Sequence, residues 1–170
     1  DLADFTSGNA AKKAEFVKNL GDAYQNIGFV AIKNHGLNEL LQHKLYEVIQ
    51  RFFALDDTKK AAYEHPEIGY QRGYTGKGKE HAKGRNTGDL KEFYHVGQDL
   101  PAIPDEDPVK QEYPSNVWPT EIPEFEQTAT EVFKAIEEAG RHMLRAIALH
   151  LRLPEDYFED KVRFGNSILR

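Results

Sequence analysis

Three stretches of the chain repeat apolar residues at the spacing of an amphipathic helix. This pattern predicts helices over residues 10–27, 39–54 and 124–151. A side-chain oxygen at a helix start accepts a hydrogen bond from a free backbone N–H, so Ser7 or Asn9 is expected to cap the first helix and Asn38 the second. Pro154 is expected to open a further short helix that runs to Phe158.

A short apolar run between the first two helices has the composition of a strand. The residues from Phe29 to Ile32 are aromatic, β-branched or small, which is typical of a strand buried on both faces. Gly28 suits the left-handed position that ends a helix, and the Asn34-His35-Gly36 segment has the composition of a turn. The sequence therefore predicts a strand over Gly28 to Lys33.

A second strand is predicted over Leu90 to Val96. Because side chains alternate along a strand, one face should carry Glu92, Tyr94 and Val96, and the other should carry Lys91, Phe93 and His95. The residues before this strand, Gly69 to Gly88, contain six of the thirteen glycines and predict a long loop.

The remaining segments are assigned from caps and prolines. Asp56 or Asp57 should start a short helix through Tyr63 that Pro66 ends, and Pro101 to Pro123, with six of the eight prolines, should be irregular and extended. Both ends are strand-like: residues 1–5 read as the tail of one strand and residues 162–170 lead into another. The chain is therefore expected to be part of a longer protein.

Composition narrows the class of protein. A length of 170 residues with 39% hydrophobic and 29% charged residues is that of a globular domain. The formal net charge of −6 argues against nucleic-acid binding, and no apolar run approaches the roughly 20 residues that cross a bilayer. No cysteine is present, which excludes disulfides and thiolate metal sites and favours a cytoplasmic location.

Motif searches return no complete catalytic site. The Gly73–Lys79 segment has the glycine spacing of a phosphate-binding loop, but Glu80 follows where Ser or Thr is required. The pairs His65/Glu67, Glu92/His95 and Glu138/His142 have metal-ligand spacings, but their positions on a helix end, on a strand and on a helix surface do not suit a metal. The sequence predicts no metal site and no catalytic residue in this chain.

Five segments, in this order, resemble the N-terminal region of the non-haem iron, 2-oxoglutarate-dependent dioxygenases, in the subgroup that contains isopenicillin N synthase. They are Gly28-Phe29-x-x-Ile32-x-Asn34-His35-Gly36, Gln71-Arg72-Gly73-Tyr74, Asp89-Leu90-Lys91-Glu92-Phe93-Tyr94, Asn116-Val117-Trp118-Pro119 and Asn166-Ser167-Ile168-Leu169-Arg170. The family's iron ligands, His-x-Asp and a distant His, and its 2-oxoglutarate motif, Arg-x-Ser, do not occur here.

The resemblance implies an α+β fold in which residues 1–165 form a helix-rich lobe and residues 166–170 begin the first strand of a catalytic double-stranded β-helix. It further implies an oxidase that uses Fe(II), O2 and 2-oxoglutarate on a small organic substrate, with both cofactors held by a C-terminal catalytic domain. A helical binding module without chemistry is the alternative. Isopenicillin N synthase itself uses no 2-oxoglutarate, so this co-substrate is implied by the wider family.

The resemblance also directs attention to five residues as the substrate side of the whole enzyme's cavity. An arginine in a loop can meet a carboxylate with two hydrogen bonds, an aromatic ring supplies an apolar wall, and two side chains on one strand face point together. The candidates are Arg72, Tyr74, Phe93, His95 and Arg170. The alternative is a solvated Arg72 and a Phe93 that belongs to the core.

Overall fold

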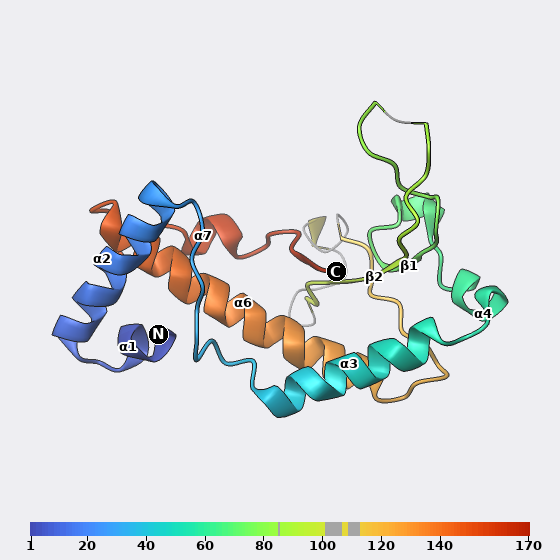
Figure 1. Ribbon diagram of the computed structural model, residues 1–170, viewed down its shortest axis with the longest axis horizontal. Helices are drawn as coiled ribbons and strands as arrows, with labels where there is room; N and C mark the ends of the chain where they lie inside the picture. Colours follow the sequence, from blue (N-terminus) through green and yellow to red (C-terminus); the bar gives the residue numbers. More distant parts are fainter. Residues whose placement is uncertain (85, 101–106, 109–112) are drawn as a thin grey trace. The chain divides into compact units, whose positions relative to one another are not determined.

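The computed structural model describes residues 1–84, 86–100, 107–108 and 113–170. It contains several helices and a small antiparallel sheet, which confirms the α+β class (Figure 1). The chain divides into a first unit, residues 1–42 with 134–165, and a second unit, residues 43–133 with 166–170. No helix in the described ranges is both long and apolar enough to cross a membrane.

The long helices lie where the apolar spacing predicts them, to within one residue at each end. The elements in order are α1 Leu2–Thr6, α2 Ala10–Asn26, α3 Glu39–Phe53, α4 Asp57–Ala61, a 3-10 turn Pro66–Ile68, β1 Gly73–Thr75, β2 Phe93–Gly97, α6 Phe125–His150, α7 Glu159–Val162 and β3 Ile168–Leu169. Asn9 caps α2 through Lys12 N at 3.1 Å, and Asn38 caps α3 through Leu41 N at 2.9 Å.

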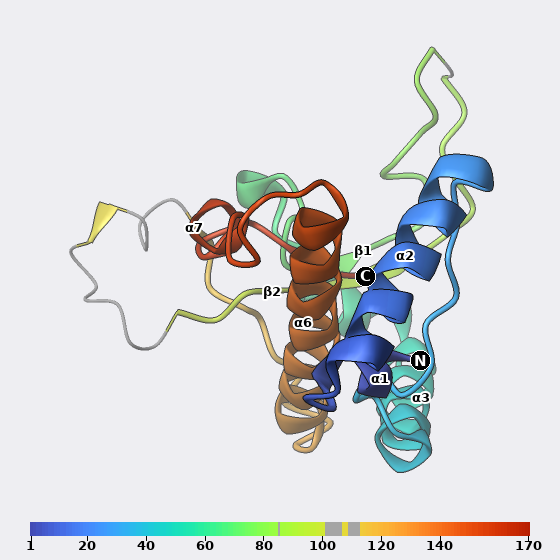
Figure 2. The ribbon, with the colours of Figure 1, turned by 90° about the vertical axis from the view of Figure 1, so that its left-hand side faces the viewer.

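The first unit has its own apolar core. The α1 helix lies against α2, where the rings of Phe5 and Phe16 are 5.5 Å apart (Figures 1 and 2). The buried residues of this core are Leu2, Phe5, Phe16, Leu20 and Ala146. The prediction that residues 1–5 are the tail of a strand was wrong, because Asp1 accepts a hydrogen bond from Ala3 N at 3.0 Å and starts a helical turn that buries Leu2 and Phe5.

The segment Gly28 to Lys33 is extended but is not a strand, so this prediction was also wrong. Gly28 has the expected left-handed conformation, with φ of 83°. Val30 and Ile32 pack against the core of the first unit, whereas Phe29 is 81% exposed. No strand of the described residues pairs with the segment. Its β-branched residues favour an extended backbone with one apolar face, but a strand also needs a hydrogen-bonded neighbour.

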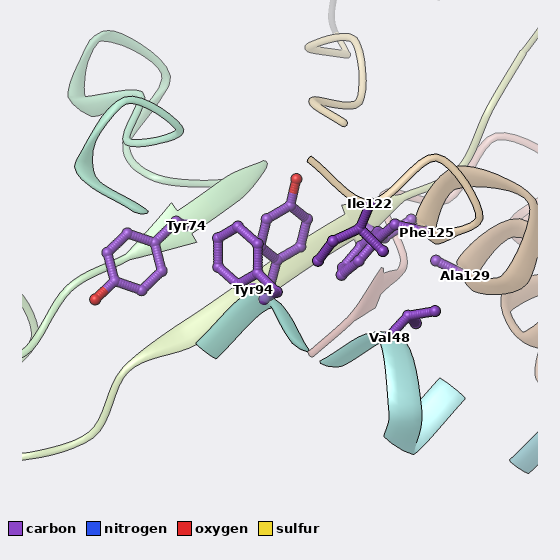
Figure 3. Packing of buried hydrophobic residues seen from close by; sticks show 8 residues of the cluster. Val48, Tyr74, Tyr94, Ile122, Phe125 and Ala129 are labelled. Atoms are coloured by element: carbon purple, nitrogen blue, oxygen red, sulfur yellow. The ribbon is translucent and has the colours of Figure 1, made fainter. Parts of the chain in front are cut away.

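The second unit is built around a sheet with the strand order β1-β2-β3, in which both pairings are antiparallel. Phe52 of α3 lies 5.8 Å from the ring of Tyr74 in β1 and 4.7 Å from that of Tyr94 in β2. Phe125 of α6 lies 4.7 Å from Tyr94 on the same side (Figure 3). We call this side of the sheet the aromatic face.

Several strand and turn boundaries differ from the predicted ones. The second strand begins at Phe93 instead of Leu90, although its alternation is as predicted, because Tyr94 and Val96 enter the core. A short strand, β1, lies inside the predicted glycine-rich loop. The prediction of a helix from Pro154 to Phe158 was wrong, because these residues form a turn in which Tyr157 N donates to Pro154 O at 3.0 Å, and α7 begins only at Glu159. Much of the predicted irregular segment from Pro101 to Pro123 lies outside the described residues.

Candidate functional site

The side of the sheet opposite the aromatic face carries most of the candidate side chains. Phe93 and His95 alternate with Tyr94 along β2, and their rings are stacked with centroids 6.0 Å apart and planes inclined by 10°. The register pairs Val96 with Leu169 and Gly97 with Ile168, so it brings Arg170 beside His95. We call this side, with Arg72, Thr75, Phe93, His95 and Arg170, the arginine face.

Arg170 covers the ring of Phe93. Its guanidinium carbon lies 3.6 Å from the ring centroid, which is the arrangement of a cation–π contact. The same guanidinium forms an ion pair with the carboxylate of Glu80. Glu80 lies in the loop between β1 and β2, whose two arms leave the sheet together (Figures 1 and 2) and are joined by Asp89 N donating to Glu80 O at 2.7 Å.

The ring of His95 has one nitrogen that donates a hydrogen bond to the protein and one that can accept a hydrogen bond. Its Nδ1 lies 2.8 Å from the carbonyl oxygen of Tyr70, which only accepts, so Nδ1 carries a proton and donates it. Burial lowers the pKa of His95 below its ordinary value, and the positive charges of Arg170 and Arg72 act in the same direction. In the neutral ring, Nε2 is therefore an acceptor for a donor group of a ligand.

Arg72 is fully buried, with 0% of its surface exposed, and is not a solvated loop residue. Its Nη1 donates to the Gln71 carbonyl at 2.8 Å and its Nη2 to Asn166 Oδ1 at 3.0 Å. A Cβ atom on Gly97 would lie 2.0 Å from the guanidinium carbon, so Arg72 rests on the backbone of β2 where a side chain would otherwise stand. Burial lowers the pKa of Arg72, but a guanidinium stays charged in proteins.

Two buried polar atoms on the arginine face have no hydrogen-bond partner among the described residues. They are Arg72 Nε and Thr75 Oγ1. Thr75 pairs with Phe93 in the register, which places both on the same side of the sheet. The Arg72 guanidinium lies at Gly97, so the two atoms lie toward opposite ends of β2 on one side of the sheet. Because native proteins satisfy nearly all buried polar groups, two unpaired groups on one side of the sheet are consistent with a role in binding.

Tyr74 lies on the aromatic face, apart from the other four candidates. Its hydroxyl donates to Glu92 Oε2 at 2.6 Å, and Lys60 Nζ lies 2.9 Å from the same oxygen. Burial and the bond to Glu92 raise the pKa of Tyr74 to about 12. Burial alone would raise the pKa of Glu92, but the hydrogen bonds from Tyr74 and Lys60 outweigh it and lower this pKa.

The described residues do not supply the set of ligands that iron needs. They contain no group of three or more His, Asp or Glu side chains that fits a metal ion. His65 Nδ1 lies 2.7 Å from Glu67 Oε1, and His142 Nε2 lies 3.2 Å from Glu138 Oε1, so each histidine contacts a carboxylate close to it in sequence. Glu92 and His95 point to opposite sides of the sheet, and residues 73–75 of the phosphate-loop pattern are a strand.

Sequence reasoning missed four residues that shape the arginine face. Gly97 provides the space for Arg72, Asn166 holds its guanidinium, Glu80 pairs with Arg170, and Thr75 adds a buried hydroxyl. Asn166 lies 94 positions from Arg72 in the sequence, and Glu80 lies 90 positions from Arg170. The alternation of side chains along a strand could have placed Thr75 and Gly97 on this face, since they lie in β1 and β2. The contacts of Asn166 and Glu80 join residues far apart in the sequence and leave no local pattern.

The described residues form a helix-rich fold with a small sheet, one side of which carries two arginines and incompletely satisfied polar groups. The family model for the N-terminal region of the non-haem dioxygenase in morphine synthesis matches residues 1–121. The chain belongs to this family, the N-terminal region of 2-oxoglutarate- and Fe(II)-dependent dioxygenases. Fe(II) and 2-oxoglutarate are the cofactors of this family.

Named relatives agree with this placement. The chain is 26% identical to the 2-oxoglutarate-Fe(II) type oxidoreductase hxnY of Emericella nidulans and 30% identical to ppzD of Metarhizium rileyi, with 100% of this chain covered in both cases. These alignments cover 50% and 49% of the relatives, so the chain spans about half of their length.

Solved structures show the same fold. A putative 2OG-Fe(II) oxygenase family protein from Caulobacter crescentus matches 94% of this chain and 51% of its own, with a TM-score of 0.81 and 33% identity. A full-length Neurospora crassa protein, solved in complex with alpha-KG, matches 99% of this chain and 48% of its own, with a TM-score of 0.76 and 26% identity.

Proposed function

We propose that the full-length protein is an iron(II)-dependent oxidoreductase that oxidises a small organic substrate with O2 and couples this to decarboxylation of 2-oxoglutarate. The observation that supports this proposal most strongly is that relatives named as 2-oxoglutarate-Fe(II) oxidoreductases align along this entire chain. The described residues offer no fit for the metal, so the proposal assigns iron and 2-oxoglutarate to the C-terminal catalytic part of the protein. The role of this chain is then to bind and orient the substrate.

Within that role, the arginine face is the proposed substrate side of the cavity. Phe93 forms an apolar wall, His95 Nε2 accepts a hydrogen bond, and Arg170 offers a guanidinium oriented by the Phe93 ring. Arg72 adds a buried positive charge with a free Nε–H. Tyr74 is proposed to act from the aromatic face, where its bond to Glu92 helps to fix β1 against β2.

We propose that the remainder of the protein supplies strands that pair with two segments of this chain, residues 29–32 and β3. The extended segment 29–32 exposes Phe29 and has no strand partner in the described ranges, and β3 lies at one edge of its sheet. Unpaired strand edges with an exposed aromatic residue favour pairing with a further strand. Hydrogen exchange in the full-length protein should find slow amides at residues 29–32, whereas fast exchange there would refute this pairing.

The proposed reaction is tested with the full-length protein, purified anaerobically and supplied with Fe(II), 2-oxoglutarate and O2. Succinate should form in an iron-dependent manner, and omission of iron or O2 should stop it. Absence of succinate in the complete mixture would contradict the proposal and favour a helical binding module. The predicted cytoplasmic location stays a prediction and is tested by fractionation of the source cells.

A further inference from the structure

We propose that the substrate carries a carboxylate group, which binds the Arg170 guanidinium in place of the Glu80 carboxylate. This inference rests on the proposed function, because it names the class of substrate for the same face. It begins with an imbalance of charge. The described side chains of the arginine face include two guanidinium groups, Arg72 and Arg170, and Glu80 is the carboxylate that pairs with one of them.

The group that binds Arg170 in this structure is itself a carboxylate, that of Glu80. The guanidinium lies over Phe93, and its Nη2 donates a hydrogen bond to Glu80 Oε2. Planar guanidinium groups bind carboxylates with two parallel hydrogen bonds, so the position that Glu80 occupies is one that a substrate carboxylate fits. Phe93 beside this position provides contact for the apolar body of an organic acid.

The ion pair between Glu80 and Arg170 is suited to exchange. The side chains are 40% and 44% exposed, and exposed ion pairs contribute only about 0–1 kcal/mol to stability. The pair between Lys60 and Glu92 on the aromatic face is different, because its side chains are only 5% and 19% exposed. A carboxylate from solution therefore competes with Glu80 at small cost.

The neighbouring groups favour a ligand over a purely structural pair. Arg72 Nε and Thr75 Oγ1 are buried without partners on the same side of the sheet. His95 adds an acceptor at Nε2, which suits a hydroxyl or amine near the carboxylate. The Glu80 carboxylate satisfies Arg170 but leaves Arg72 Nε and Thr75 Oγ1 unpaired.

The test uses the full-length protein with saturating 2-oxoglutarate, so that the site for this co-substrate is filled. Benzoate and its neutral analogue benzamide are titrated by calorimetry. Benzoate should bind about tenfold more tightly, as expected for charge-assisted hydrogen bonds. Glu80→Gln removes the internal competitor and should strengthen benzoate binding by up to about fivefold, while benzamide binding stays the same.

Matched variants locate the effect. Glu124→Gln removes the same charge from another exposed ion pair, in which the carboxylate lies 3.3 Å from Arg51 and outside the arginine face, so benzoate binding should not change. Arg170→Gln should abolish the preference for benzoate, and Arg170→Lys, which keeps the charge, should retain part of it. The proposal is overturned if wild-type protein binds benzoate no better than benzamide, or if Glu80→Gln and Glu124→Gln act alike.

Succinate formation is measured on the same preparation, which separates the two proposals. A protein that forms succinate but does not prefer benzoate refutes only the carboxylate inference. A protein that prefers benzoate through Arg170 but forms no succinate refutes only the proposed reaction.

Discussion

The two sides of the three-stranded sheet differ in whether their buried polar groups have hydrogen-bond partners. On the aromatic face, Tyr74 donates to Glu92 at 2.6 Å and Tyr94 donates to the Val117 carbonyl at 2.6 Å. On the arginine face, Arg72 Nε and Thr75 Oγ1 are buried without a partner in the described part of the chain. Because an unpaired buried group costs about 1–3 kcal/mol, the arginine face gives up stability that the aromatic face retains.

The contrast separates residues that hold the fold from residues available for binding. Phe52 contacts Tyr63, Tyr74, Tyr94 and Phe125, so the rings of the aromatic face pack against one another. The arginine face instead carries the guanidinium groups of Arg72 and Arg170 and the imidazole of His95, all at β2. Incompletely satisfied polar clusters are more typical of functional sites than of cores.

The aromatic face should respond most strongly to truncation. Phe52→Ala should lower the free energy of unfolding by about 3–5 kcal/mol, because it removes a fully buried ring and leaves a cavity. Tyr46→Ala on the same helix is the control, since Tyr46 is 57% exposed and its change should stay within about 0.5 kcal/mol. Denaturant unfolding of the full-length protein measures both, and equal losses would mean that Phe52 is not central to the core.

The packing of Arg72 on Gly97 gives the next largest effect. Gly97→Ala should cost about 1–3 kcal/mol of stability, because the new methyl group would overlap a guanidinium that is itself held by Asn166. In the double variant with Arg72→Ala, the overlap is gone and the two losses should not add. Additive losses in the double-mutant cycle would show that the two residues do not contact each other.

These two residues also mark the limit of sequence reasoning. The three long helices, α2, α3 and α6, were predicted to within a residue because a repeated apolar spacing identifies a helix without knowledge of its partner. Arg72 was expected in a long glycine-rich loop, but its environment depends on Gly97 and Asn166, which lie far along the chain. Local patterns carry no information on such pairings.

The strand predictions also succeeded where the pattern is local and failed where it depends on distant residues. The alternation of Phe93, Tyr94 and His95 was correct, since one face of a strand is visible in sequence. The segment Gly28–Lys33 has strand composition but pairs with no strand of the described residues, because pairing requires a second chain segment at the right place. Asp1 formed a helix cap where a strand tail was expected, since five residues are too few for a clear period.

The hydrogen bond between Tyr74 and Glu92 predicts a pH dependence. Tyr74→Phe should cost about 1–2 kcal/mol near pH 7, because a hydrogen bond to a charged carboxylate is lost. The pKa of Tyr74 is raised to about 12 in the folded protein from 10.0, so its stabilising contribution is complete below pH 10 and is lost as the pH rises toward 12. Unfolding curves at pH 8 and above pH 10 should show the difference between variant and wild type shrinking, and a constant difference would contradict this assignment.

The central claim is that the arginine face binds the organic substrate while the catalytic cofactors lie elsewhere. The most direct measurement is the KM for substrate and for 2-oxoglutarate in full-length Arg72→Ala and Arg170→Gln, with Lys83→Gln on the β1–β2 loop as the control for loss of charge. We predict that the arginine variants raise the substrate KM by about tenfold, as for a lost charged hydrogen bond, and change the 2-oxoglutarate KM by less than about twofold. An unchanged substrate KM in both arginine variants would contradict the claim.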